Sequence, residues 1–282
     1  MREIKNYVQS LLKRVGIYER LKTSFVYDLY WRIVDDRYIN ARRKEVESYR
    51  DLLEGFQSGD LILDIGANDG TKANIFLRLG ARVVAVEPDE HNQEVLRQRF
   101  LSYRLFKKPV TIVGKAVSDR NAVETMWINA PGSWMNTLNR KWVETLKDDS
   151  TRFGTSLEFG QQREVNTVTI EDLFKEHGLP FFVKIDVEGY EVNVLRGLRQ
   201  AVQYLSFEIN LPEFKSEGLQ CIELLESVSS DGEFNYAVDL CRGLSLKKWL
   251  RVEEFLPVFH ERTEKCIEVF WRTGKRTKID RK

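Results

Sequence analysis

The sequence predicts an α/β protein with a Rossmann-like, doubly wound, mostly parallel sheet and an N-terminal helical appendage. Short apolar segments alternate with amphipathic ones from residue 60 onward, as strands alternate with helices. The links between them are short, which favours parallel strands joined by crossover helices. A glycine turn, LDIGANDG, follows the first expected strand directly. Such sheets bind ligands at the carboxyl ends of their strands, so the chemistry is expected there.

The chain of 282 residues suits one large domain with an appendage. Its formal net charge of +1 lacks the basic excess of a nucleic-acid binder, so we expect no nucleic-acid partner. The three cysteines and three histidines show neither disulfide nor zinc spacing. No apolar run approaches the roughly 18 residues of a membrane span. The first residues also lack the pattern of a signal peptide, and we therefore expect a cytoplasmic protein.

Residues 1–57 are expected to form the helical appendage. Apolar residues recur every three or four positions from Ile4 to Val15, and basic residues outnumber acidic ones in residues 1–22. A basic amphipathic helix suits peripheral attachment to the inner face of a membrane. It equally suits packing on the core or homodimer formation, and the sequence leaves these alternatives open.

Residues 58–272 are expected to form the main domain, and residues 273–282 a basic, disordered tail. The expected strands are LILDIG, RVVAVEP, PVTIVGKAVSD, AVETMWI, EVNTVTI, FFVKID, AVQYLSFEIN, FNYAVDL and CIEVFW. The expected helices are TKANIFLRLG, DEHNQEVLRQRFLSYRLF, EDLFKEHG, EVNVLRGLRQ and LQCIELLESVSS. The letters T-I-E-D at 169–172 indicate a capping box. Residues 129–162 show no clear pattern, and a loop of that length is usually functional or mobile.

The glycine turn carries the first candidate site. Asp64 ends the strand, and Gly66 and Gly70 allow left-handed backbone before a helix begins. The usual dinucleotide fingerprint has three glycines, whereas Asn68 stands in place of the middle one. S-adenosylmethionine (SAM) carries an ammonium group, which suits Asp64 as an acceptor. A dinucleotide site, a SAM site and a purely structural turn all remain open at this point.

The second strand ends in a further carboxylate. Glu87 is placed where it can accept hydrogen bonds from two ribose hydroxyls, and Pro88 after it ends the strand. This position favours a nucleotide-like ligand over a purely structural turn.

The stretch FFVKIDVEGYE presents two carboxylates at another strand end. Asp186 is a candidate general base for an acceptor hydroxyl. Asp186 and Glu188 could instead hold a divalent cation, with Glu208 as the best third ligand. Glu188 could also cap the following helix. We assign no metal from the sequence, and Lys184 is left as a cation that could lie at the surface.

The long loop is expected to cover the acceptor. Ser133, Trp134, Asn136 and Thr137 combine a flat apolar surface with hydroxyl and amide groups, a composition suited to sugars. A hydrophobic lid without direct contact to the acceptor is the alternative.

The chain resembles the FkbM-type methyltransferases, a branch of the SAM-dependent enzymes, over residues 58–210. The resemblance rests on LDIGANDG, VVAVEPD, KAVSD, NTL, VKIDVEGYE and LSFEIN, which occur in the family's order. It implies a SAM-binding site in which Glu87 and Pro88 lie at the ribose. The residues that would line the methionine end are Asp64, Gly66, Ala67, Asn68 and Gly70. Ser118 and Asp119 would lie against the adenine, although Asp119 could also cap a loop.

The resemblance further implies O-methylation of a hydroxyl on a sugar, a glycolipid or polysaccharide precursor, or another natural product. The acceptor would then be a glycan or another small molecule.

Two other functions remain open on the sequence alone. An NAD(P)-dependent sugar oxidoreductase or epimerase would need a Tyr-x-x-x-Lys pair after the fourth strand. Tyr18 with Lys22 and Tyr103 with Lys107 have this spacing, but elsewhere in the chain. A non-catalytic Rossmann-like scaffold is the second alternative, and the presence of Asp64, Glu87 and Asp186 argues against it.

Overall fold

The computed structural model describes residues 36–101, 109–148 and 157–274. The expected basic helix in residues 1–22 and both Tyr-x-x-x-Lys pairs lie outside these ranges. Within them, no helix is long and apolar enough to cross a membrane.

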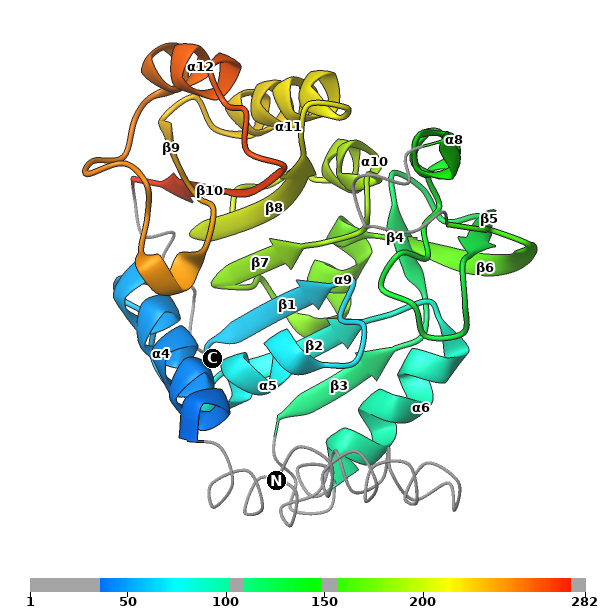
Figure 1. The fold of residues 1–282 in the computed structure, drawn as a ribbon. Coiled ribbons are helices and arrows are strands. Elements are labelled where there is room, and N and C mark those ends of the chain that lie inside the picture. Colours follow the sequence, from blue (N-terminus) through cyan, green and yellow to red (C-terminus); the bar gives the residue numbers. More distant parts are fainter. Residues whose placement is uncertain (1–35, 102–108, 149–156, 275–282) are drawn as a thin grey trace.

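A seven-stranded sheet forms the centre of the molecule, with the strand order β3-β2-β1-β7-β8-β10-β9 (Figure 1). β1, β2, β3, β7 and β8 are parallel, whereas β10 runs antiparallel to both of its neighbours. The bounds are β1 Leu61–Ile65, β2 Arg82–Val86, β3 Val110–Val113, β7 Phe182–Ile185, β8 Tyr204–Asn210, β9 Gly232–Ala237 and β10 Cys266–Thr273. The predicted doubly wound, mostly parallel sheet is therefore confirmed.

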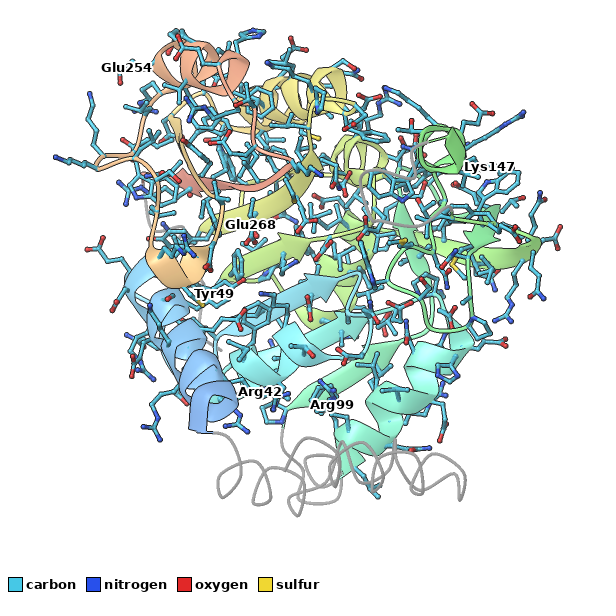
Figure 2. All side chains as sticks on the ribbon, viewed as in Figure 1. Arg42, Tyr49, Arg99, Lys147, Glu254 and Glu268 are labelled. Carbon is cyan, nitrogen blue, oxygen red and sulfur yellow. The ribbon has the colours of Figure 1, made fainter. Side chains whose placement is uncertain are left out.

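Helices cover both faces of the sheet because its central strands are nearly continuous buried, mostly apolar runs, so both of their faces must be shielded from water. Leu61, Leu63 and Ile65 of β1 pack toward α9 (Ile170–His177), α10 (Glu191–Arg196), α11 (Lys215–Val228) and α12 (Val252–His260). Ile62 packs on the other face, with α4 (Asp36–Leu52), α5 (Thr71–Leu79), α6 (Glu90–Arg99) and the 3-10 helix η1 (Leu240–Arg242). α4 joins the core through Tyr49, which is fully buried. Figure 2 labels Tyr49 and Glu268 where α4 meets the sheet.

A second, three-stranded sheet lies at the carboxyl ends of the central strands (Figure 1). It consists of β4 (Ala116–Ser118), β6 (Gln161–Thr169) and β5 (Val123–Ile128). The expectation of one strand over PVTIVGKAVSD was wrong. The chain leaves the main sheet after β3 and enters the small sheet at β4, and an apolar pattern does not show which partner each half will pair with.

A helix also interrupts the long segment that was expected to lack regular structure. α8 spans Arg140–Asp148 and buries Trp142 and Val143, with the Trp142 ring 5.0 Å from that of Phe214. Two buried positions give too weak a periodicity to predict a helix. By contrast, the helix start expected from the capping box at α9 is confirmed, because Thr169 is the N-cap residue and its Oγ1 accepts a hydrogen bond of 3.1 Å from the Asp172 amide.

Candidate active site

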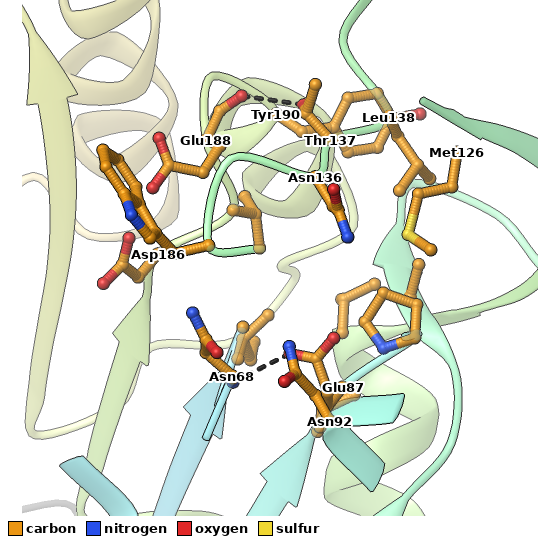
Figure 3. A pocket seen from close by; sticks show the side chains of 18 of the residues that line it. Asn68, Glu87, Asn92, Met126, Asn136, Thr137, Leu138, Asp186, Glu188 and Tyr190 are labelled. Carbon is orange, nitrogen blue, oxygen red and sulfur yellow. Dashed lines mark hydrogen bonds between the residues drawn. The ribbon is translucent and has the colours of Figure 1, made fainter. Parts of the chain in front are cut away.

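One cavity lies where the small sheet meets the carboxyl ends of β1, β2, β7 and β8. Its volume is about 240 Å³, slightly below the roughly 300–1,000 Å³ of small-molecule sites, and it opens to solvent. Figure 3 shows Asn68, Glu87 and Asn92 on one side of it and Asp186 and Glu188 on another. The expected site residues that line the cavity are Gly66, Asn68, Glu87, Pro88, Ser133, Trp134, Asn136, Thr137, Asp186, Glu188 and Glu208.

Glu87 is held in place by the backbone around it. Its two carboxylate oxygens each accept one amide hydrogen bond, at 2.8 Å from Asn68 and at 2.9 Å from Asp89. The side chain is only 6% exposed, and burial raises the pKa of Glu87 to about 7, although these two bonds oppose the shift. Each oxygen keeps a second lone pair that a ligand's hydroxyl groups can use.

Gly66 is required by the closeness of two strand ends rather than by the ligand alone. A Cβ atom at this position would lie 1.8 Å from the main-chain oxygen of Asp186. Its φ of +81° is also in the left-handed region that favours glycine. The turn after β1 can therefore pass against β7, which places Asn68 beside Glu87.

Three of the expected cofactor residues support the turn without lining the cavity. Asp64 is 1% exposed and pairs in register with Lys184 on β7. Ala67 donates its amide hydrogen to the Val86 carbonyl at 3.0 Å. A Cβ on Gly70 would lie 2.5 Å from the side chain of Leu96, so this glycine allows α5 to begin close to α6.

Lys184 is buried, contrary to its interpretation as a surface cation. Its side chain is 4% exposed, and its Nζ donates to Asp186 Oδ2 at 2.6 Å. Burial alone would lower the pKa of Lys184, but the negative charges of Asp186, Glu268 and Asp64 outweigh it and raise the pKa. The spacing of Lys184 and Asp186 by two residues on one strand could have indicated a shared face.

Three carboxylates meet at the same end of the cavity. One oxygen each from Asp186, Glu188 and Glu208 lies within 4.8 Å of the other two. Burial, followed by the charge of Asp186, raises the pKa of Glu208 to about 7. The same causes, joined by the charge of Glu208, raise the pKa of Glu188 well above its ordinary value. The arrangement concentrates negative charge beside a solvent-accessible space.

The turn that carries Glu188 is fixed from two directions. Thr137 Oγ1 donates to the Glu188 carbonyl at 2.8 Å, and Asn139 donates from its amide to the Gly189 carbonyl. From the other side, Glu191 Oε1 accepts the amide hydrogens of Val187 and Gly189, each at 3.2 Å. Glu191 is 2% exposed, and burial raises its pKa to about 8. Its role was missed in the sequence, although it closes the quoted motif.

The polar groups of the expected substrate residues bind the protein itself. Asn136 Nδ2 donates to Asp89 Oδ2 and to the Ala130 carbonyl, both at 2.9 Å. Ser133 Oγ donates to Asn129 Oδ1 at 3.1 Å. Trp134 is different, because its side chain is half exposed at the cavity. Of these residues, Trp134 offers the surface most open to an acceptor.

Neither Ser118 nor Asp119 is among the residues that line the cavity. Ser118 is fully buried, and its hydroxyl donates to Glu124 Oε1 at 2.8 Å. Tyr190 lines the cavity and also donates to Glu124. The wall itself is formed nearby by Lys115, Ala116, Val117, Met126 and Leu138, which the sequence did not single out.

Comparison with known proteins decides between the open interpretations. A family model for the methyltransferase FkbM domain matches residues 64–235, more than half of the chain. The chain belongs to the FkbM methyltransferase family. The family membership expected from its motifs is thereby confirmed.

Individual relatives are distant from this FkbM protein. A chloroplastic ribosomal RNA small subunit methyltransferase of Arabidopsis thaliana is 37% identical over 51 residues, which span 18% of this chain and 15% of that protein. The crystal structure of a methyltransferase FkbM from Methylobacillus flagellatus KT has a TM-score of 0.48 and 17% identity, covering 78% of this chain and 46% of its own. The plantazolicin methyltransferase BpumL, solved in complex with a triazolic desmethylPZN analog and SAH, has a TM-score of 0.39 and 11% identity, over 95% of this chain and all of its own.

The residues of this FkbM protein fit SAM. Glu87 presents free lone pairs for the ribose hydroxyls, beside Gly66 and Asn68, which also line the cavity. Met126 and Leu138 lie on another side of the cavity (Figure 3) and offer an apolar surface to a flat base. The carboxylates of Asp186, Glu188 and Glu208 are then left for the end of the cavity where the acceptor would bind.

Proposed function

We propose that this FkbM protein O-methylates a hydroxyl of a sugar, of a glycolipid or polysaccharide precursor, or of another polyhydroxylated natural product. The observation that supports this is that Glu87 and Asp186 line the same cavity, from the carboxyl ends of β2 and β7 on either side of β1. One carboxylate is thus available to the donor and another to the acceptor.

Residues on the donor side of the cavity position SAM, and a residue on the acceptor side accepts the proton of the attacking hydroxyl. When bound, SAM supplies a methyl group on a positively charged sulfur, which departs as a neutral thioether with the electron pair of the broken bond. Glu87 holds the ribose by accepting hydrogen bonds, which positions the donor. An attacking hydroxyl must lose its proton as the new O–C bond forms, and we assign that proton to the carboxylate of Asp186. Lys184 keeps Asp186 oriented by holding its Oδ2 atom.

The exposed face of Trp134 supports a carbohydrate as acceptor. This residue is 50% exposed and lines the same cavity as the carboxylates. An aromatic ring gives the C–H face of a sugar an apolar surface, while carboxylates accept hydrogen bonds from sugar hydroxyls.

The test is a methyl-transfer assay with labelled SAM against a panel of glycans and polyols, with amines and carboxylic acids included. We expect label in an ether linkage, and we expect Asp186→Asn to bind S-adenosylhomocysteine (SAH) while losing turnover. Label on nitrogen or carboxylate acceptors alone would contradict the assignment of oxygen. Full turnover in Asp186→Asn would remove Asp186 as the proton acceptor.

A further inference from the structure

The three carboxylates at the acceptor end come from separate segments that the fold brings together. β7 and β8 are parallel neighbours with Ile185 opposite Phe207, so Asp186 and Glu208 follow at adjacent strand ends. Glu188 reaches them from the turn after β7, and each residue offers an oxygen within 4.8 Å of the other two. Figure 3 shows the side chains of Asp186 and Glu188 at one end of the cavity.

The carboxylate of Glu188 gives independent evidence that this cluster binds a ligand. The residue is only 9% exposed, and its Oε2 atom is buried with no hydrogen-bond partner among the residues that the structure describes. Its backbone has a φ of +52°, which a non-glycine residue adopts only where its surroundings enforce it. The hydrogen bonds from Thr137 and Asn139 to the carbonyls of the turn hold the backbone in this conformation. The fold thus holds a buried carboxylate close to two others, with one oxygen that no described residue hydrogen-bonds.

The nearby positive charge does not balance the cluster. Lys184 contacts Asp186 Oδ2 at 2.6 Å. Cys266 contributes a neutral hydrogen bond to Glu208. Among the groups that the structure describes at this point, one ammonium therefore faces three carboxylates. The side chain of Glu188 has the fewest stabilising partners of the three.

The spacing and chemistry of the three oxygens match a hard divalent cation. Magnesium binds oxygens at about 2.1 Å and calcium at about 2.4 Å, so the ligand oxygens of an octahedral site lie roughly 3–5 Å apart. The three ligands are all carboxylates, which suit magnesium, manganese or calcium better than zinc or copper. Three protein ligands also leave coordination positions open toward the cavity.

The geometry points to a divalent cation site formed by Asp186, Glu188 and Glu208, with open coordination positions that take oxygen atoms of the methyl acceptor. The cation binds two neighbouring oxygens of one molecule, which directs the enzyme to acceptors with adjacent hydroxyls or with a hydroxyl next to a carbonyl. The acceptor part of this inference rests on the proposed function, whereas the cation site does not. With the cation bound, Asp186 serves as its ligand, and a hydroxyl on the cation is acidified so that its proton passes to solvent instead of to Asp186.

Manganese binding to the full chain tests the cation site without donor or acceptor. Electron paramagnetic resonance of free Mn²⁺ during titration with MnCl₂ is expected to show one saturable site per chain, from which Mg²⁺ displaces Mn²⁺. Glu188→Gln is expected to weaken this site at least tenfold. Glu253→Gln, which removes the same charge from an exposed position on α12, is expected to bind as the wild type does. No saturable binding in the wild type, or equal binding in Glu188→Gln, would overturn the site.

Two further measurements keep the outcome interpretable. Retained SAH binding by Glu188→Gln would show that the variant has folded with an intact cofactor side. Water-proton relaxation by the bound Mn²⁺ reports its open positions, and exchangeable inner-sphere water is expected. A bound ion without such water would overturn the acceptor contact. Neither measurement uses methyl transfer. A failure of the cation site can therefore be distinguished from a failure of the proposed O-methylation.

Discussion

Lys184 Nζ lies 2.6 Å from Asp186 Oδ2, and the lysine side chain is 4% exposed. The two residues are two positions apart on one chain segment and so project to the same face of the sheet. Asp64 on β1 and Ser206 on β8 flank Lys184 in register. The ammonium group therefore stabilises buried negative charge and fixes the orientation of the carboxylate that faces the acceptor.

Removing this ammonium group should destabilise the fold. We expect Lys184→Met to lower the free energy of unfolding by about 3–5 kcal/mol, because it leaves buried carboxylates without their partner. Urea denaturation measures the effect. Lys175→Met, which breaks the exposed pair with Asp172, should change stability far less. An equal loss in the free energy of unfolding in the two variants would contradict the claim that burial makes the Lys184–Asp186 pair important for stability.

The hydroxyl of Thr137 should matter through the turn that it holds. Thr137→Val keeps the shape of the side chain but leaves the Glu188 carbonyl without its 2.8 Å bond. The residue is 1% exposed, so we expect a loss of about 1–3 kcal/mol in the free energy of unfolding. Methyl transfer should fall more than SAH affinity, because Glu188 lies on the acceptor side. Thr137→Ser retains the hydroxyl and should restore most of both quantities.

Substitutions at Gly66 and Gly59 distinguish the cost of a positive φ from the cost of a steric clash between a new Cβ atom and a neighbouring strand. Gly66→Ala places a Cβ 1.8 Å from the Asp186 carbonyl oxygen at a φ of +81°. Gly59→Ala imposes similar strain at a φ of +94°, but with nothing within 4 Å of the new atom. Left-handed strain alone costs of order 1–3 kcal/mol, and Gly66→Ala should exceed Gly59→Ala clearly in denaturant unfolding. It should also abolish SAH binding, and similar behaviour of the two variants would exclude the collision as the reason for Gly66.

The raised pKa of Glu87 predicts a pH-dependent cofactor affinity. Burial moves this pKa from 4.5 to about 7, and the ribose needs the ionised carboxylate as acceptor. A proton therefore competes with the ligand, so SAH affinity should be highest above pH 8 and fall below pH 7, by at most about tenfold per pH unit. Calorimetry between pH 5.5 and 8.5 measures this dependence. Glu87→Gln should bind more weakly and without this slope, and a flat wild-type profile would contradict the shift.

The strand-end rule explains why part of the site could be predicted. Glu87 and Asp186 end apolar strands, and parallel strands bring their carboxyl ends to one edge of the sheet. Their common cavity follows from that local pattern. The bond from Thr137 to Glu188 could not be predicted, because it joins distant segments through main-chain geometry.

Burial of polar residues was the hardest feature to predict. Lys184 interrupts an apolar strand in the way a surface residue would, and only the register with Asp64 and Ser206 reveals its position beneath the site. Ser118 belongs to a family motif, yet its hydroxyl is used by Glu124. α12 was missed because it contains Pro257 and lies in a segment without a clear pattern.

Calorimetric titration of SAH and NAD into the wild-type protein and Glu87→Ala is the most direct test of the cofactor site. We expect saturable SAH binding in the wild type, none in Glu87→Ala, and no NAD binding in either protein. Binding of SAH to Glu87→Ala with wild-type affinity would contradict the assignment of the cavity to SAM, and so would binding of NAD alone.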